Sequence, residues 1–185
     1  MGPNPGFASI IKKAVVEANK ENEVRDERIK NVIIFGAEES SNPSRDERMK
    51  QDKELIKGLF NEIGLSPVPA FDEVLRLGRW NAQTRNGKRP LRFRMESEEA
   101  KGKLMESLVN LREADEKYKA LSIKHDLTIE QREDLKIMVN EAKTLTEAEN
   151  DGHFLYRVRC SPGAHWRPKI VKLKSRRGVP TANPP

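Results

Sequence analysis

Apolar residues in this chain recur at two spacings, one typical of helices and one typical of strands. Near the start, Phe7, Ile11, Ala14 and Ala18 follow helical spacing and predict a helix over residues 7–29. Acidic and basic side chains fill its other positions. Because the apolar stripe ends before three heptads are complete, two alternatives stay open: the end of a coiled coil, or a helix packed on its own domain.

The middle of the chain alternates between the two spacings in the order strand, helix, strand, strand, helix, strand. The apolar residues Leu91, Phe93 and Met95 alternate with Arg92 and Arg94, which is the period of a half-buried strand. The four strands are expected over 30–36, 73–77, 91–95 and 121–124, and the two helices over 44–63 and 96–111. This order usually folds as an antiparallel sheet with both helices on one face, so we expect an α+β fold, a ferredoxin-like βαββαβ sandwich.

A further helix and a hairpin are predicted behind the sheet. Thr128 and Gln131 form a capping box that opens the helix. Alternating residues over 154–159 and 169–174 predict two strands joined by a turn at 161–163. The expected divisions are an N-terminal helix over 1–30, a central domain over 31–127, a helix with a basic β-hairpin over 128–177, and a disordered tail over 178–185.

The chain carries a formal net charge of +6 and a pI near 9.4, which points to a polyanionic partner. The charge is unevenly placed. Residues 153–185 hold eight Lys and Arg and no Asp or Glu, whereas the residues before them hold 27 basic and 29 acidic side chains. The positive excess therefore lies in the C-terminal segment, where it either binds a polyanion or only aids solubility.

Four cations are expected on the face of the sheet that the helices leave open. Residues i and i+2 of a strand share a side, so when the apolar residues of the third strand face the helices, Arg92 and Arg94 face outward. The same argument places Arg76 and Lys124 outward. Such cations suit a phosphate backbone, and the alternative is ordinary solvated strand residues. Phe35 is the one aromatic expected at a base-stacking position, unless it belongs to the core, so binding should depend on charge and have weak base specificity.

Two tryptophans lie among cations, Trp80 after Arg79 and Trp166 before Arg167. Aromatic rings interleaved with cations bind single strands, although a tryptophan is more often a packing residue. The candidate nucleic-acid contacts are therefore Arg76, Arg79, Trp80, Arg92, Arg94, Lys124, Arg157, Arg159, Trp166, Arg167, Lys169, Lys172, Lys174, Arg176 and Arg177.

Signals for catalysis or cofactor binding are weak. His125, His153 and His165 are scattered and Cys160 is the only cysteine, which is poor support for a zinc site. The sequence has no phosphate-binding loop, dinucleotide fingerprint or nucleophile elbow, and His125-Asp126 is expected to be a cap or a surface pair. We therefore expect no enzymatic activity, no metal and no cofactor. The lone cysteine favours a reducing compartment, and no stretch is apolar enough for a membrane span.

Several short patterns recur in register with a known family. Residues 30–41, the run Arg76-Leu-Gly-Arg79 and the run Arg89-Pro-Leu-Arg-Phe93 resemble the RNA-recognition-like (RRM-like) domain of LINE-type retrotransposon first-open-reading-frame proteins. Residues 122–128 with Gln131-Arg132 are similar to the junction that follows that domain. The resemblance, which a host protein derived from such an element would share, implies a chaperone-like binder of single-stranded nucleic acid that oligomerises through a helix ahead of the domain. It also implies that the sheet arginines and the following domain grip RNA together.

Two function classes fit these features. The first is a non-enzymatic RNA- or single-stranded nucleic-acid-binding protein of a ribonucleoprotein, with an RRM-like sheet whose cations are extended by the basic hairpin. The second is a protein–protein interaction module, a pseudo-RRM adaptor in which only the basic C-terminal segment touches nucleic acid. The expected partners are RNA or single-stranded DNA, a protein of the same ribonucleoprotein, and a second copy through the N-terminal helix. The expected location is intracellular, either nuclear or cytoplasmic, with no membrane partner.

Overall fold

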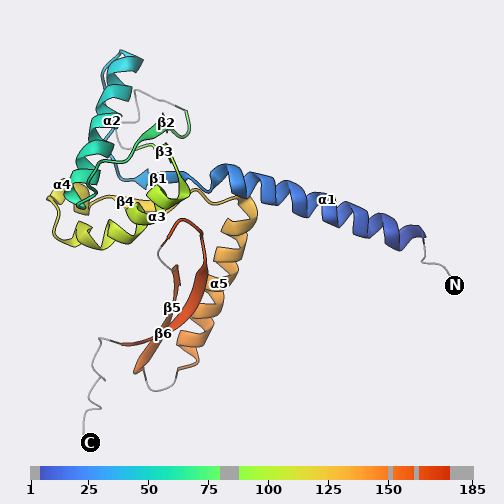
Figure 1. Cartoon of the computed structure of the whole chain (residues 1–185). Coiled ribbons are helices and arrows are strands. Elements are labelled where there is room, and N and C mark those ends of the chain that lie inside the picture. Colours follow the sequence, from blue (N-terminus) through green and yellow to red (C-terminus); the bar gives the residue numbers. More distant parts are fainter. Residues whose placement is uncertain (1–4, 80–87, 150–151, 161–162, 176–185) are drawn as a thin grey trace, which may run out of the picture. The chain divides into compact units, whose positions relative to one another are not determined.

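The structure, a computed structural model, describes residues 5–79, 88–149, 152–160 and 163–175. The chain divides into two units (Figure 1). Among the described residues, the first unit holds 5–126 with 163–165, and the second holds 127–160 with 166–175. The expected tail over 178–185 lies outside the described residues, as do two of the three residues of the expected turn at 161–163.

The first unit is built on a four-stranded sheet. Its strands lie in the order β2-β3-β1-β4, and each neighbouring pair is antiparallel. The expected α+β class with an antiparallel sheet is therefore confirmed. The elements are α1 (Pro5–Arg28), β1 (Asn31–Phe35), α2 (Arg45–Glu62), β2 (Phe71–Arg76), β3 (Leu91–Met95), α3 (Glu98–Ser107), the 3-10 helix η1 (Leu108–Arg112), α4 (Glu116–Lys119) and β4 (Ser122–His125).

Side-chain caps set where the helices of this unit begin. The Ser44 hydroxyl accepts a hydrogen bond from the backbone N–H of Glu47, and Ser97 does the same for Ala100. Because Ser97 is the cap, α3 begins at Glu98, two residues later than expected. The helix expected over 96–111 is divided: α3 ends at Ser107, and the residues that follow form the 3-10 helix η1. The sequence does not predict α4, because four residues are too few to show a helical period.

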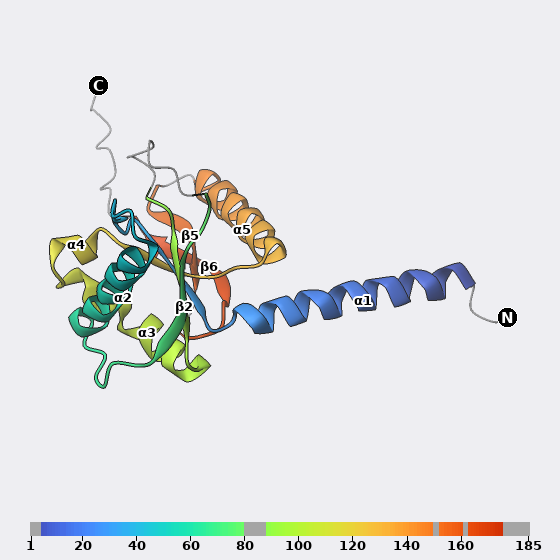
Figure 2. The same cartoon turned by 90° about the horizontal axis from the view of Figure 1, so that it is seen from above.

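One apolar core joins the sheet to the helices. The core contains Val32, Ile34, Leu91, Phe93 and Met95 from the sheet, Ile56, Leu59 and Phe60 from α2, and Ala100 and Leu104 from α3. The rings of Phe60, Phe71 and Phe93 lie 5.5 to 5.9 Å apart between centroids, in edge-to-face or tilted arrangements. Accordingly, α2, α3 and α4 lie on one side of the sheet (Figure 2), and the side chains of the other face are free of that core.

A bulge in β2 changes which of its residues face the helices. Asp72 pairs with Arg94 and Leu75 pairs with Arg92, so three steps on β2 match two steps on β3. The extra residue lies between Asp72 and Leu75, where Glu73 has a φ of +45°. Since side chains alternate along a strand, one extra residue exchanges the two faces beyond it. Leu75 therefore shares the open face with Arg92.

Helix α1 lies largely in solvent. Residues 8–20 are exposed throughout, including Ile10, Ile11 and Val15. Over this span the alternative of a helix packed on its own unit is not what the structure shows. Self-association through α1 stays a prediction.

The second unit places one helix against a two-stranded hairpin. Its elements are α5 (Ile129–Glu147), β5 (Phe154–Cys160) and β6 (Pro168–Lys174), and Thr128 and Gln131 form the predicted capping box. The Thr146 hydroxyl of α5 accepts a hydrogen bond from the Tyr156 backbone N–H at 2.8 Å. This bond satisfies a donor on the edge of β5, which would otherwise need water or another strand.

The close approach of α2 to Tyr118 generates a prediction about stability. A Cβ added at Gly58 would overlap the hydroxyl of the buried Tyr118, so Gly58→Ala should lower the free energy of unfolding by about 1–3 kcal/mol. The matched control is Gly102→Ala in α3, whose Cβ would meet Ala164 N at an ordinary 3.6 Å. The control should be neutral or up to about 1 kcal/mol more stable, because alanine favours helix. Urea denaturation measures both, and equal stabilities would contradict this packing.

Candidate nucleic-acid interface

Three of the four predicted sheet cations share the open face. Ile33 of β1 pairs with Arg92 on one side and with Lys124 on the other, and Arg94 follows Arg92 by two residues. Directly paired residues of antiparallel strands point to the same face, so all three cations do so. The side chains of Arg92 and Arg94 are each 28% exposed, and Lys124 is exposed. The face therefore presents positive charge to solvent from two strands, β3 and β4.

An aromatic ring lies among these cations. Phe35, at the end of β1, is 39% exposed and so is not a core residue. The ammonium group of Lys124 lies 5.3 Å from the centroid of its ring. Leu75, which the bulge brings to this face, is also exposed. A ring beside cations can stack on a base while the cations bind the phosphates.

Asp126 supplies negative charge directly after β4. The prediction of a surface pair is wrong for Asp126, which is only 8% exposed, and the residue that caps α5 is Thr128. Its carboxylate accepts hydrogen bonds from Asn31 Nδ2 at 3.0 Å and Arg28 Nη1 at 3.5 Å, and it lies 3.9 Å from Arg92 Nη1. The sequence indicates this face, because Asp126 follows Lys124 by two residues. It does not indicate the burial, because the partners Asn31 and Arg28 are distant in the chain.

A buried lysine lies close enough to Asp126 to interact with its charge. Lys101 of α3 is 1% exposed, and its ammonium group donates a hydrogen bond to the carbonyl of Ile29 at 2.6 Å. Burial lowers the pKa of Lys101 from 10.5 to about 8, although the charges of Asp126 and Glu98 partly oppose the shift. Burial, and then the charge of Lys101, lower the pKa of His125 to about 4. His125 is thus neutral at pH 7 and is half-buried, which corrects the expected surface position.

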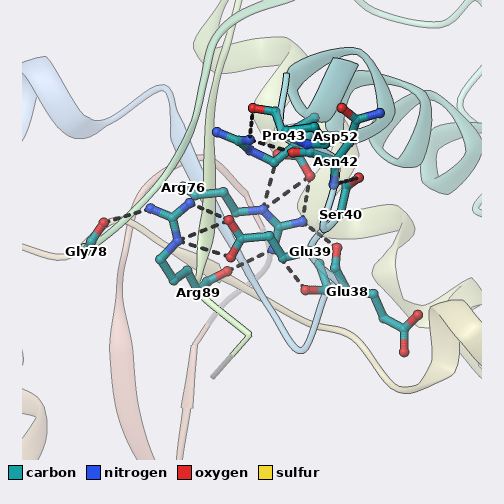
Figure 3. A network of polar contacts seen from close by, with 11 residues as sticks. Glu38, Glu39, Ser40, Asn42, Pro43, Asp52, Arg76, Gly78 and Arg89 are labelled. Atoms are coloured by element: carbon teal, nitrogen blue, oxygen red, sulfur yellow. Dashed lines mark hydrogen bonds and ion pairs between the residues drawn. The ribbon is translucent and has the colours of Figure 1, made fainter. Parts of the chain in front are cut away.

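Arg76 is not on the open face, and the prediction that it points outward is wrong. Beyond the bulge it pairs with the buried Leu91 and so lies on the helix side of the sheet. Its side chain is 4% exposed, and its Nε lies 3.2 Å from both carboxylate oxygens of Asp52 in α2. It also donates hydrogen bonds to the carbonyls of Ala37, Glu38 and Arg89 at 2.6 to 2.9 Å (Figure 3).

Arg89 completes this network without joining the open face. Its guanidinium binds the Glu39 carboxylate and donates to the Gly78 carbonyl at 2.8 Å (Figure 3). The hydrogen bond from Arg89 lowers the pKa of Glu39. Every N–H donor group of Arg76 is hydrogen-bonded within the protein. Arg76 is therefore a structural residue that links α2, the loop after β1 and the strand β2.

The cations of the hairpin divide between its two faces. Arg157, Arg159 and Lys169 are exposed on one face, as the pairing of Arg159 with Lys169 requires. Lys172 and Lys174 lie on the other. Lys172 is engaged within the unit, because its ammonium group lies 3.3 Å from a carboxylate oxygen of Glu149 and 4.2 Å from the centroid of the Phe154 ring.

The remaining predicted contact residues lie outside the sheet face and the two strands of the hairpin, or outside the described residues. Arg79 and Arg167 are exposed. Trp166 is half-buried and hydrogen-bonds the thiol of Cys160, whose pKa is raised chiefly by burial. The predicted contacts Trp80, Arg176 and Arg177 lie outside the described residues.

The buried pair of Arg76 with Asp52 yields a test that separates structural from surface arginines. Arg76→Gln should lower the free energy of unfolding by about 3–5 kcal/mol, because it leaves the Asp52 charge buried without its partner. Asp52→Asn added to it should recover part of the loss. Arg92→Gln, at a half-exposed site, is the matched control and should cost less than about 1 kcal/mol. Equal losses in chemical denaturation would contradict the assignment of Arg76.

Lys101 predicts a pH dependence of stability. Its pKa is lower in the folded protein than in the unfolded chain, so between pH 8 and about 10.5 the unfolded chain binds more protons and stability rises with pH. The difference in unfolding free energy between the wild type and Lys101→Met should therefore grow in favour of the wild type by up to about 3 kcal/mol across this window. Denaturation curves at several pH values measure it, and parallel pH profiles would contradict the burial of this charge.

The chain matches no protein-family model and no curated protein. In the described part of the chain no group of three or more His, Cys, Asp or Glu side chains is placed to hold a metal ion. Among the described helices none is long and apolar enough to cross a membrane. The described residues present cations and an exposed ring on the open face of the sheet, and further cations on the hairpin.

Proposed function

We propose that this chain is a non-enzymatic protein that binds RNA or single-stranded DNA within an intracellular ribonucleoprotein. The observation that carries the proposal is the exposed ring of Phe35 on the same sheet face as Arg92, Arg94 and Lys124. Cations spaced along neighbouring strands match the regular charge of a phosphate backbone. A ring between them supports stacking without selecting a base.

The topology supports the finer proposal of an RRM-like, ferredoxin-like domain. The order β2-β3-β1-β4, with helices on one side of the sheet, is what a βαββαβ string gives when both crossovers cover the same face. Sheets of that kind stack bases on aromatics of the two central strands. Here the central strand β1 offers Phe35, whereas β3 offers Arg92 and Arg94 instead of rings. We therefore propose that charge contributes more than stacking and that base specificity is weak.

The second unit is proposed to extend the binding surface. Arg157, Arg159 and Lys169 form an exposed cationic row on one face of the hairpin. A single nucleic-acid strand that contacts both units binds more tightly, because its second contact is intramolecular. This proposal needs no fixed arrangement of the two units.

One observation favours the adaptor alternative, a pseudo-RRM domain that binds a protein and leaves nucleic acid to the hairpin. Arg92 and Arg94 already have partners within the unit: Asp126 for Arg92, and Glu73 and the Glu27 carbonyl for Arg94. These contacts are long or exposed, and a phosphate oxygen, which forms short charge-assisted hydrogen bonds with arginine, can replace them. We therefore place nucleic acid on the sheet.

Binding of a fluorescent oligouridylate tests the proposal. Affinity measured by anisotropy should fall with salt with a slope of about −0.7 for each neutralised phosphate. The double variant R92Q/R94Q should bind about tenfold more weakly or worse, with a slope shallower by about 1.4. The matched control R45Q/R112Q removes two exposed arginines from helical segments and should change affinity much less.

The outcomes separate the alternatives. No binding at low salt overturns the proposal altogether. If R92Q/R94Q behaves like the control while R157Q/R159Q/K169Q loses all binding, the sheet is not the surface and the adaptor alternative holds.

A further inference from the structure

The carboxylate of Asp126 occupies a place on the open face that an incoming phosphate would compete for. It is nearly buried, and three side chains of the first unit converge on it: Asn31, Arg28 and Arg92. A carboxylate removed from water requires such partners, because burial of an unpaired charge is costly. Of the three, Arg92 belongs to the proposed binding surface.

The ion pair between Asp126 and Arg92 is long. Their nearest N and O atoms are 3.9 Å apart, beyond hydrogen-bonding distance, so the contact is electrostatic only. Asp52 and Arg76 show the contrast, since both carboxylate oxygens of Asp52 lie 3.2 Å from Arg76 Nε and one lies 2.5 Å from Nη2. Arg92 is also 28% exposed, so an anion from solvent can reach it, whereas Arg76 is 4% exposed.

If Arg92 moves away from Asp126, the carboxylate keeps its hydrogen-bond donors. Asn31 still donates its hydrogen bond at 3.0 Å, and Arg28 remains within 3.5 Å. The buried ammonium group of Lys101 adds positive charge close enough to interact with Asp126. The geometry thus permits Arg92 to be exchanged while the carboxylate keeps a donor and a counter-charge.

We propose that Asp126 is a built-in competitor of phosphate, which neutralises Arg92 in the free protein and sets the affinity of the sheet for a polyanion. The inference rests on the proposed function, since it names the residue that regulates the same surface. A strand of nucleic acid offers several phosphates in sequence and so displaces Asp126 through neighbouring contacts. Asp126 acts through Arg92 and does not contact the ligand itself, so it is a positioning residue that sets affinity.

Replacement of Asp126 by its neutral isostere tests this idea. Asp126→Asn should bind the oligouridylate about five- to tenfold more tightly at low salt, with a salt slope steeper by about 0.7, because Arg92 then neutralises one further phosphate. The matched control is Asp134→Asn on α5, which removes the same charge from an exposed position and should change affinity by less than about twofold. A gain no larger than that of the control overturns the proposal.

A double-mutant cycle assigns the effect to the pair. In the Arg92→Gln background, Asp126→Asn should give no further gain, because the side chain it releases is absent. A gain that persists there reports the net charge of the protein and contradicts the proposal. It leaves the binding function itself intact, since that is judged by the wild type and R92Q/R94Q.

The wild-type protein provides a readout that does not depend on a variant folding. The side-chain carboxyl carbon resonance of Asp126 should shift as oligouridylate saturates the protein, since Arg92 leaves its vicinity. An unchanged resonance at saturation overturns the proposal. If neither the wild type nor Asp126→Asn binds at low salt, both this inference and the proposed function fail.

Discussion

Two carboxylates of the first unit, Asp52 and Asp126, are removed from water, and a carboxylate in that position must be matched by cations and hydrogen-bond donors. At Asp52 the match is close. The guanidinium of Arg76 binds that carboxylate and three backbone carbonyls, which brings together the helix α2, the loop after β1 and the strand β2. The geometry of that end of the sheet therefore depends strongly on this one side chain, which joins all three elements.

At Asp126 the arginine of the sheet lies farther away, at 3.9 Å, than Arg76 lies from Asp52. This difference separates the arginines of the sheet into structural residues and residues that can bind an anion. A guanidinium with every donor bonded inside the protein, such as that of Arg76, holds the fold together. One with long or exposed contacts, such as that of Arg92, remains open to an anion from solvent. Residue type alone does not distinguish these two kinds of arginine. They differ in the burial of the side chain and in the number of hydrogen bonds that it donates within the protein.

Much of the first unit follows from the order of apolar residues. The alternation at Leu91, Phe93 and Met95 predicts both the strand β3 and the outward position of Arg92 and Arg94. The capping box at Thr128 predicts the start of α5, and the alternation after it predicts the hairpin. These features are local, so a single sequence is enough to reveal them.

The errors share a different origin, which is that they depend on long-range geometry. The bulge at Glu73 inserts one residue into β2, and nothing in the pattern of residues 71–76 reveals it, so Arg76 was placed on the wrong face. The burial of Asp126 and Lys101 depends on Arg28 and Ile29, which are about 70 to 100 residues away in the chain. Phe35 could be assigned neither to core nor to surface until the strands on each side of β1 were known.

We propose that nucleic acid binds the open face of the sheet through Arg92 and Arg94 while Arg76 and Arg89 stay bonded within the protein. Arginine side-chain Nε–Hε resonances, followed by NMR during titration with an unstructured oligonucleotide, test it most directly. Binding at this face should shift the signals of Arg92 and Arg94 and the ring signals of Phe35 progressively, and should leave the signals of Arg76 and Arg89 unchanged. Shifts confined to Arg157 and Arg159 of the hairpin, with the sheet signals unmoved at saturation, would contradict it.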